Sequence, residues 1–363
     1  MNLKHIGRPA VIAVAAALAL SSCAANESGA PASGGTTSAL SGTINAAGSS
    51  AQAAAQEGWI ASFQTANPKV TVNYDPTGSG AGRATFIAGG SDFAGSDSFL
   101  KDEELAGSFK ACAPKSKAVD LPVYISPIAV IFNVKGVTDL NLDATTIAKI
   151  FKGDIKTWND PAIAALNKGA SLPSTPITAV HRSDDSGTTK NFTDYLNQNA
   201  PSVWTDAPAD PFPLKTGEGA QGTSGVVDAV TNGVGTIGYA DASRAGKLGV
   251  AKIKVGDKFV GYTADGAAAV VNDSPLVAGR ESNDLAIALD RKTTDATHYP
   301  LVLVSYAVVC TEYTDPAQAK LVKAYVGYMA GADGQTVAAK ASGSAPLSTD
   351  VQAKVADVLA TIK

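Results

Sequence analysis

The sequence has few of the residues that enzymes use for nucleophilic or metal-dependent chemistry. Only three of its 363 residues are histidine and three are cysteine, and His5 falls in a segment that we expect to be removed. It contains no His-Glu-x-x-His, no Gly-x-Ser-x-Gly and no Gly-x4-Gly-Lys-Ser/Thr. Zinc-dependent hydrolysis, serine hydrolysis and nucleotide chemistry therefore lack their usual groups. The sequence predicts a binding protein and not an enzyme, without a cofactor or a metal site.

The sequence also lacks an excess of basic residues. Lysine and arginine number 29 against 33 aspartate and glutamate residues, and without Lys4 and Arg8 the balance becomes 27 against 33, a net charge of −6. Nucleic-acid-binding domains are usually basic, so this balance argues against a nucleic-acid partner. An anion would have to be bound by local groups, because the whole molecule provides no positive field.

No uninterrupted apolar run approaches the length that a membrane-spanning helix needs. Residues 1–22 have a basic start (Lys4, Arg8) and a short apolar stretch (11–20), which predicts a lipoprotein signal peptide. The following Leu-Ser-Ser-Cys resembles a bacterial lipobox, so we expect Cys23 to be acylated, with palmitate as a fatty chain. An ordinary cleaved secretory signal is the alternative. Residues 23–40 are Ala, Ser, Gly and Thr, which predicts a flexible tether.

Cysteine usage agrees with export. If Cys23 is lipidated, Cys112 and Cys310 remain, and an even pair in an exported protein most simply forms a disulfide. The alternative is two separate buried thiols. The lipid would then be the only membrane attachment, at the outer face of the cell membrane.

The remaining chain, about 320 residues, is long enough for two domains of an α/β protein. Four predicted strands run into Gly/Ser-rich loops, and helical patterns follow three of these loops. The four junctions are 43–50, 70–82, 91–97 and 177–189. Junctions of this kind are typical of an open sheet whose ligand lies beyond the strand ends.

The last of these junctions has the groups needed to hold a small oxyanion. A predicted strand (177–180) precedes the loop, and a helix is expected to begin near Ser186. Helix N-termini present unpaired N–H groups, Gly187 permits close approach, and Arg182 adds a fixed fork of donors. The alternative is that Ser186 is only a helix cap and Arg182 only a surface ion-pair partner.

Two apolar segments, 121–132 and 300–310, predict extended crossings between the domains. Further helices are expected from residue 142, at 161–167 and around 226–230, and a strand at 235–239. Two helices, near 315–331 and 348–362, are expected to close the chain.

Five segments occur in the order and spacing of the substrate-binding protein of bacterial phosphate ABC transporters, which the sequence therefore resembles. They are 74–82, 91–97, 152–159, 181–188 and 235–239. The resemblance implies an α/β, two-lobed periplasmic-binding-protein fold of type II, with two crossing segments and a ligand cleft. Lobe 1 would comprise 41–124 and 301–363, and lobe 2 would comprise 125–300. The protein would be an extracytoplasmic monomer that binds inorganic phosphate and delivers it to the permease subunits of an ABC importer.

The resemblance also implies the ligand residues. They are Ser49, Ser50, Ala51, Ser79, Asp97, Arg182, Ser186, Gly187 and Thr188. Asp184 matches the aspartate that orients the arginine. At the first junction the family often has Gly-Ala-Thr-Phe or Gly-Ser-Thr-Leu, whereas this chain has Gly48-Ser49-Ser50-Ala51. The hydroxyl is kept at Ser50, but the large apolar neighbour is replaced by Ala51.

The chemistry of this set favours phosphate over sulfate. Phosphate retains one or two protons at neutral pH, so a buried Asp97 carboxylate can accept a hydrogen bond from it. A sulfate oxygen would face the carboxylate with no proton between them, which is costly in a dry site. The alternatives are a binder of another tetrahedral oxyanion, sulfate or arsenate, and a phosphate-ester hydrolase on the same fold.

Overall fold

The computed structural model describes residues 40–363, and the structural statements below refer to them. These residues belong to one compact unit. The predicted signal peptide, the lipidation site Cys23 and the predicted tether up to residue 39 lie outside the described residues.

The structure alternates strands and helices, which confirms the predicted α/β class. The strands are β1 (Gly42–Gly48), β2 (Val70–Asp75), β3 (Phe93–Ser96), β4 (Ala118–Asn133), β5 (Asn141–Leu142), β6 (Thr178–Arg182), β7 (Glu218–Ala220), β8 (Thr236–Asp241), β9 (Gly249–Val250), β10 (Lys252–Val255), β11 (Lys258–Val260) and β12 (Val302–Cys310). The helices are α1 (Ala53–Ala66), α2 (Ser79–Ile87), α3 (Asp102–Ala106), α4 (Ala144–Lys152), α5 (Pro161–Leu166), α6 (Gly187–Asn199), α7 (Gly222–Asn232), α8 (Ala264–Asp273), α9 (Pro316–Ala330), α10 (Ala332–Ser342) and α11 (Thr349–Thr361).

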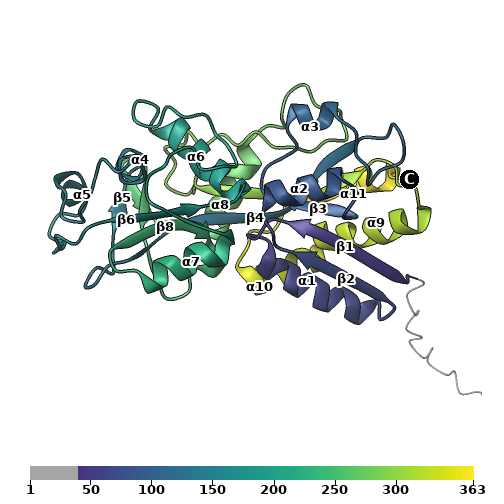
Figure 1. Cartoon of the computed structure of the whole chain (residues 1–363), viewed down its shortest axis with the longest axis horizontal. Coiled ribbons are helices and arrows are strands. Elements are labelled where there is room, and N and C mark those ends of the chain that lie inside the picture. The colour runs from purple at the N-terminus through teal and green to yellow at the C-terminus, as the bar shows by residue number, and fades with distance from the viewer. Residues whose placement is uncertain (1–39) are drawn as a thin grey trace, which may run out of the picture. The chain divides into compact units, whose positions relative to one another are not determined.

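The long strand β4 joins two lobes. The main sheet has the order β2-β1-β3-β12-β4-β8-β6-β7. Up to Pro127, β4 pairs with β12, and from Ile128 it pairs with β8. Lobe 1 therefore contains β1–β3, β12 and the first part of β4, and lobe 2 contains β6–β8 and the last part of β4 (Figure 1). The two segments predicted as crossings, 121–132 and 300–310, correspond to strands β4 and β12.

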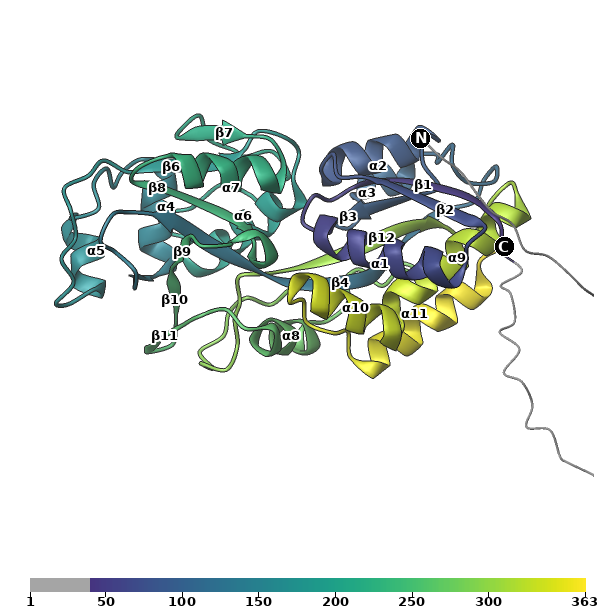
Figure 2. The same ribbon diagram turned by 90° about the horizontal axis from the view of Figure 1, so that it is seen from below.

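Helices cover both faces of the sheet in each lobe. In lobe 1, α2 covers one face of β1 and β3, and α1, α9, α10 and α11 cover the other (Figure 2). In lobe 2, α7 packs on one face of β6 and β8, while α4 and α6 lie on the other (Figure 1).

Apolar spacing explains the packing of α4, whose buried face contains Ile147, Ile150 and Phe151. Asp143 caps the start of α4, and Gly153 ends it in the left-handed conformation at φ 80°.

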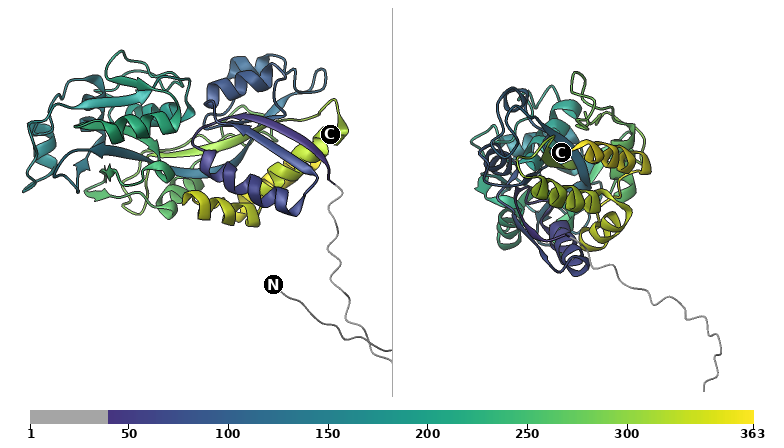
Figure 3. Two further views of the ribbon diagram at one scale, coloured as in Figure 1. Left: turned by 60° about the horizontal axis from the view of Figure 1, so that its bottom comes forward. Right: turned by 90° about the vertical axis from the view of Figure 1, so that its right-hand side faces the viewer.

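The C-terminal region differs from the prediction, because three helices close the chain instead of two. The additional helix is α10, which follows α9 after Gly331 and packs against α1 (Figure 3). Its buried residues are small or polar, Gly334, Gln335, Ala338 and Ser342. This face has little apolar contrast, so the pattern that predicted α9 and α11 was absent from α10.

The segment after α8 lies against lobe 1, although the resemblance assigns it to lobe 2. The backbone N–H of Leu285 donates to the carbonyl of Asp120 on β4, at 3.0 Å. The N–H of Ile287 donates to the hydroxyl of Tyr306 on β12, also at 3.0 Å. The residues at which one lobe ends and the other begins therefore remain a proposal.

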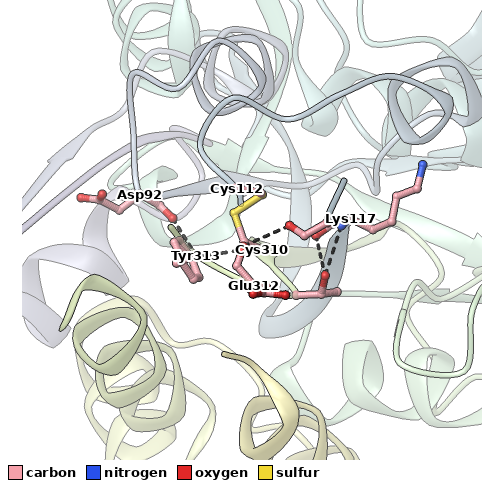
Figure 4. Close-up of a disulfide and its surroundings, with 8 residues drawn as sticks. Asp92, Cys112, Lys117, Cys310, Glu312 and Tyr313 are labelled. Atoms are coloured by element: carbon pink, nitrogen blue, oxygen red, sulfur yellow. Dashed lines mark hydrogen bonds between the residues drawn. A yellow bond between two sulfur atoms is a disulfide. The ribbon is translucent and has the colours of Figure 1, made fainter. Parts of the chain in front are cut away.

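A disulfide joins Cys112 to Cys310, as the cysteine count predicted, with 5.3 Å between the Cα atoms (Figure 4). Cys310 ends β12, and its N–H donates to the hydroxyl of Tyr313, which in turn donates to the carbonyl of Asp92. The bridge thus fixes the loop before β4 to the end of β12, although the two cysteines are 198 positions apart in the sequence.

Candidate functional site

Four helix N-termini meet where the two lobes touch. They belong to α1 and α2 of lobe 1 and to α6 and α7 of lobe 2. Ser79, the first residue of α2, accepts a hydrogen bond at Oγ from the N–H of Asp97, 3.0 Å away. Thr188 of α6 donates to Asp97 across the lobes at 3.0 Å. The N–H of Thr223 in α7 donates to the hydroxyl of Ser50, before α1, at 3.0 Å. The junction therefore contains the positive ends of four helix dipoles.

Three of these four helices, like α10 elsewhere, receive no hydrogen bond from the side chain of their own N-cap residue. Helices α4, α5, α8, α9 and α11 each have a side chain that caps their first turn. At the start of α7 the N–H groups of Gly222 and Thr223 donate instead to Asp184 and Ser50, and just before α1 the N–H of Ala51 donates to Ser49. In α6, Ser186 accepts only from the N–H of Thr189, which leaves the N–H groups of Gly187 and Thr188 for another acceptor. Unpaired N–H groups at a helix N-terminus are the usual donors to a bound oxyanion.

Asp97 lies at the centre of this junction and is 4% exposed. Its Oδ1 accepts hydrogen bonds from Ser49 at 2.5 Å and from Ser305 at 2.6 Å. Its Oδ2 accepts from Thr188. Burial raises the pKa of Asp97 above its ordinary value, while the hydroxyls of Ser305, Ser49 and Thr188 and the charge of Arg182 oppose this rise. A cavity of about 370 Å³ opens beside it, lined by both lobes.

Arg182 ends β6 and is held by Asp184. Its Nε donates to Oδ1 of Asp184 at 2.7 Å, and its Nη2 donates to Oδ2. Asp184 also accepts from the N–H of Gly222 at the start of α7. Although burial alone would raise it, the pKa of Asp184 is lowered by this contact with Arg182. The guanidinium is 3% exposed, and in the described chain its Nη1 has no protein acceptor. It is thus a buried, oriented cation with one donor available.

Gly187 allows the lobes to approach closely at this point. A Cβ atom on Gly187 would lie 2.7 Å from two atoms of Asp97 and 2.8 Å from Oγ of Ser79. Such contacts are too short for any side chain, so only glycine fits while the lobes are in this arrangement. The N–H of Gly80 in α2 makes a second close contact, donating to the carbonyl of Asp185 at 2.9 Å.

The first junction is built somewhat differently from the pattern that the resemblance implies. Oγ of Ser50 lies 2.9 Å from Oγ1 of Thr223, in the other lobe. The N–H of Ala51 donates to Oγ of Ser49 at 3.1 Å. All nine predicted ligand residues thus lie at or beside the junction, and their roles as ligand residues remain predictions.

Sequence reasoning missed three polar residues at the junction: Thr223, Ser305 and Asp210. Thr223 ends a Gly-rich loop (215–223), and turns favour such residues whether or not they bind a ligand. Ser305 stands in an otherwise apolar and aromatic strand, Val302–Cys310, where a buried hydroxyl requires a partner. Asp210 lies in a proline-rich stretch that resembles an ordinary surface loop.

Asp210 forms a buried ion pair between the lobes. Its Oδ2 lies 2.7 Å from Nη2 of Arg83 in α2, and its Oδ1 accepts from Ser98 at 2.5 Å. The carbonyl of Asp210 also accepts from the N–H of Ser186, so the ion pair is attached directly to the start of α6. Burial would raise the pKa of Asp210, but Arg83 and Ser98 hold it below its ordinary value.

Among residues 40–363, no helix is both long and apolar enough to span a bilayer. The same range contains no group of three or more His, Cys, Asp or Glu side chains that could hold a metal ion.

Comparison with known proteins identifies the family. A family model described as a PBP superfamily domain matches residues 32–333. Phosphate-binding protein PstS 3 of Mycobacterium leprae is 37% identical over 339 residues, covering 90% of each chain. Phosphate-binding protein PstS 2 of Mycobacterium tuberculosis is 34% identical over 367 residues, covering 98% of each chain.

A solved structure shows the same fold. A high-affinity periplasmic phosphate-binding protein (PfluDING), determined with bound phosphate, matches 86% of this chain and 93% of its own, with a TM-score of 0.69 and 22% identity. This likeness confirms the predicted two-lobed fold. Together with the two mycobacterial relatives, it shows that the chain belongs to the PBP superfamily and, within it, to the family of PstS phosphate-binding proteins.

Proposed function

We propose that this protein binds one inorganic phosphate ion between its lobes and delivers it to an ABC import permease. Relatives of more than 30% identity over nearly the whole chain are named phosphate-binding proteins, and a structural neighbour holds phosphate. The protein acts as an extracytoplasmic substrate-binding subunit. Transport requires capture and release of the ion, so we infer that the lobes close on phosphate and open at the permease.

The observation that supports this function best is the set of uncapped helix N-termini around a buried arginine. Helices α1, α2 and α7 have no cap from the side chain of their own N-cap residue, and α6 directs two N–H groups to the same junction. Arg182 and Asp184 together are neutral, so the anion is held mainly by oriented dipoles and not by net charge. This agrees with the acidic composition of the chain, which supplies no positive field.

The proposed ligand residues come from four loops. They are Ser49, Ser50, Ala51, Ser79, Asp97, Arg182, Ser186, Gly187 and Thr188, with Asp184 orienting Arg182. Backbone N–H groups and hydroxyls donate to the phosphate oxygens, and Nη1 of Arg182 supplies a charged donor. We expect the Ala51 N–H to exchange its Ser49 acceptor for the ligand, because both lie at the start of α1.

Asp97 provides the selection between phosphate and sulfate. A carboxylate only accepts hydrogen bonds, so it pairs with the O–H of a protonated phosphate and repels a fully deprotonated sulfate. Arsenate has the same protonation pattern as phosphate, so this residue does not distinguish the two. Sulfate binding is the second candidate function only if Asp97 is protonated in the working pH range.

The finer features of localisation and assembly are also part of the proposal. Acylation of Cys23 would attach the protein to the outer face of the membrane, with residues 23–40 as a tether. The binding unit would act as a monomer. We expect no phosphatase activity, because no histidine is among the ligand residues and the carboxylate beside Ser49, that of Asp97, is already held by three hydroxyls.

Calorimetric titration of the purified, unlipidated chain with phosphate, sulfate and arsenate tests the proposal. Phosphate should bind with one site per chain, sulfate should not compete at neutral pH, and scattering should show a smaller radius of gyration with phosphate. A chain that binds sulfate but not phosphate would refute the proposed ligand. Hydrolysis of a phosphate ester by the pure protein would support the enzyme alternative.

A further inference from the structure

The ionised state of Asp97 is stabilised by hydroxyl groups that can donate their hydrogen only to its carboxylate. Ser49 and Ser305 both contact the same oxygen, Oδ1, at 2.5 and 2.6 Å. A hydroxyl has one hydrogen and can either donate or accept at a given contact. Whether these two groups donate to Asp97 is therefore decided by their other partners.

The second partner of Ser305 is a donor. Nε2 of Gln52 lies 2.6 Å from Oγ of Ser305 and 3.2 Å from the carbonyl oxygen of Tyr306. A carbonyl only accepts, so the nitrogen of the Gln52 amide, and not its oxygen, must face this side. The Ser305 oxygen accepts from Gln52, and its hydrogen is left for Asp97.

Hydrogen bonds on the side of Gln52 that faces away from Ser305 fix the orientation of its amide. Nε2 of Gln56 donates to Oε1 of Gln52 at 2.9 Å, and the hydroxyl of Tyr325 donates to Oε1 of Gln56 at 2.8 Å. Each member of this buried series donates towards Asp97. Reversing one bond would place two donors or two acceptors face to face in the core.

Ser49 is constrained in the same way. The N–H groups of Ala51 and Gln52 point to its oxygen, at 3.1 and 3.4 Å, so its hydrogen is also directed to Asp97. Oδ1 therefore faces two O–H donors, which favour the ionised form of the carboxylate. While Asp97 is ionised, a proton between Oδ2 and the ligand must come from the ligand.

Ser305 reaches this position because strand β12 is irregular there. The pairing of β12 with β4 shifts between Ser305 and Tyr306. Irregularities of this kind change the direction of a side chain within a sheet. Ser305 is fully buried in β12, where that strand pairs with the lobe 1 part of β4.

We propose that Ser305 is a positioning residue for anion selection: oriented by Gln52, it holds Asp97 as an ionised acceptor, so that the site admits a protonated oxyanion and excludes a fully deprotonated one. The inference rests on the proposed function. It concerns how Asp97 is kept ionised, and not whether phosphate binds.

Other charged or titratable groups near Asp97 are left unchanged by the test. Arg182 from β6, Tyr74 from β2 and Asp241 from β8 interact with its charge. The cavity beside Asp97 is also lined by Lys190, Asp194, Arg291 and Tyr306. Because these groups are common to all the variants, a difference between variants reports the hydroxyl alone.

The test compares the pH dependence of sulfate competition in the parent and in Ser305→Ala. A hydrogen bond to a carboxylate shifts its pKa by on the order of one to two units. Sulfate should therefore compete with phosphate in Ser305→Ala at a pH about one to two units higher than in the parent. Phosphate itself should still bind, because it can pair with either form of Asp97.

Two further variants separate positioning from general damage to the fold. Thr236→Val removes another buried hydroxyl, on strand β8, which contacts the carbonyls of Val230 and Gly233 and not Asp97. Ser305→Thr keeps the hydroxyl. Both should show the sulfate profile of the parent. If Ser305→Ala does not unfold cooperatively, Ser49→Ala removes the other donor to Oδ1 and should produce the same shift.

The possible results differ in what they refute. Phosphate-selective binding by the parent together with unchanged selectivity in Ser305→Ala would overturn the inference alone. The same shift in Thr236→Val would also overturn it, because the effect would not depend on contact with Asp97. A parent that does not bind phosphate would overturn the proposed function, and this inference with it.

Discussion

Replacing Asp210 by asparagine should weaken phosphate binding without changing which anion is bound. Asp210 is in lobe 2, and its side-chain partners Arg83, Ser98 and Lys101 are in lobe 1, at 2.7, 2.5 and 3.4 Å. These contacts exist only while the lobes touch. The ion pair should therefore stabilise the closed arrangement and contribute to affinity through closure, although Asp210 is not a proposed ligand residue.

The size of the effect follows from the burial of the pair. Both side chains are almost inaccessible, at 1% for Arg83 and 0% for Asp210, so solvent screening is small. A hydrogen bond to a charged group contributes about 1.5–3 kcal/mol, and every 1.4 kcal/mol changes an equilibrium tenfold, so affinity should fall about 10- to 100-fold. The full loss requires that the open form dominates without ligand. A protein already mostly closed would lose less.

Glu104→Gln is the matched control. Arg83 also donates from Nε to both oxygens of Glu104, each at 3.1 Å, but Glu104 lies on α3 in the same lobe. This variant removes the negative charge of another partner of Arg83 without changing a contact between the lobes. Its phosphate affinity should remain within about threefold of the parent, since a partly exposed pair contributes little.

Titration calorimetry and scattering would measure both variants against phosphate and sulfate. The pKa of Asp210 is held below its ordinary value, so its contribution is present above the ordinary pKa of aspartate and is lost as the pH falls through the lowered value. The difference between parent and Asp210→Asn should thus shrink in acid. Equal losses in Asp210→Asn and Glu104→Gln, or unchanged affinity in Asp210→Asn, would refute the reasoning.

Three other predictions concern the ligand set, the bridge and the anchor. Arg182→Ala should lower phosphate affinity by about one to two orders of magnitude with selectivity kept, whereas Asp97→Asn should lose less affinity and admit sulfate; competition titration distinguishes them. Cys112 and Cys310 should react with thiol reagents only after reduction, and loss of the bridge should lower the free energy of unfolding by about 2–5 kcal/mol in denaturant titrations. Cys23→Ala should move the protein from the membrane fraction to the soluble fraction while phosphate binding is kept, and unchanged membrane association would contradict acylation.

Elements defined by local pattern were predicted closely from the sequence. The expected strand at 177–180 and helix from Ser186 correspond to β6 (Thr178–Arg182) and α6 (Gly187–Asn199). A short apolar run, a polar loop and spaced apolar residues are all contained in one stretch of chain. Helix α10 was missed because its buried face is made of small and polar residues, which give no periodic apolar pattern.

Contacts that depend on strand order could not be predicted in this way. Strand β12 lies between β3 and β4 in the sheet, and this brings Ser305 to Asp97, 208 positions away in the sequence. Asp210 reaches Arg83 across 127 positions. The local sequence around Ser305 looks like an ordinary buried strand, and that around Asp210 looks like an ordinary solvated loop. Nothing in either segment alone indicates a contact at the site.

The partners of Asp97 also differ by lobe, and this division has a consequence for how the site works. Oδ1 is bound by Ser49 and Ser305, both in lobe 1, whereas Oδ2 is bound by Thr188 in lobe 2. When the lobes separate, Asp97 keeps both donors on Oδ1 and loses the one on Oδ2. The carboxylate therefore stays oriented and ionised in lobe 1, with Oδ2 free to accept from an incoming protonated oxyanion. Lobe 1 can thus select the anion before lobe 2 closes over it, because the selecting group does not depend on closure for its own hydrogen bonds.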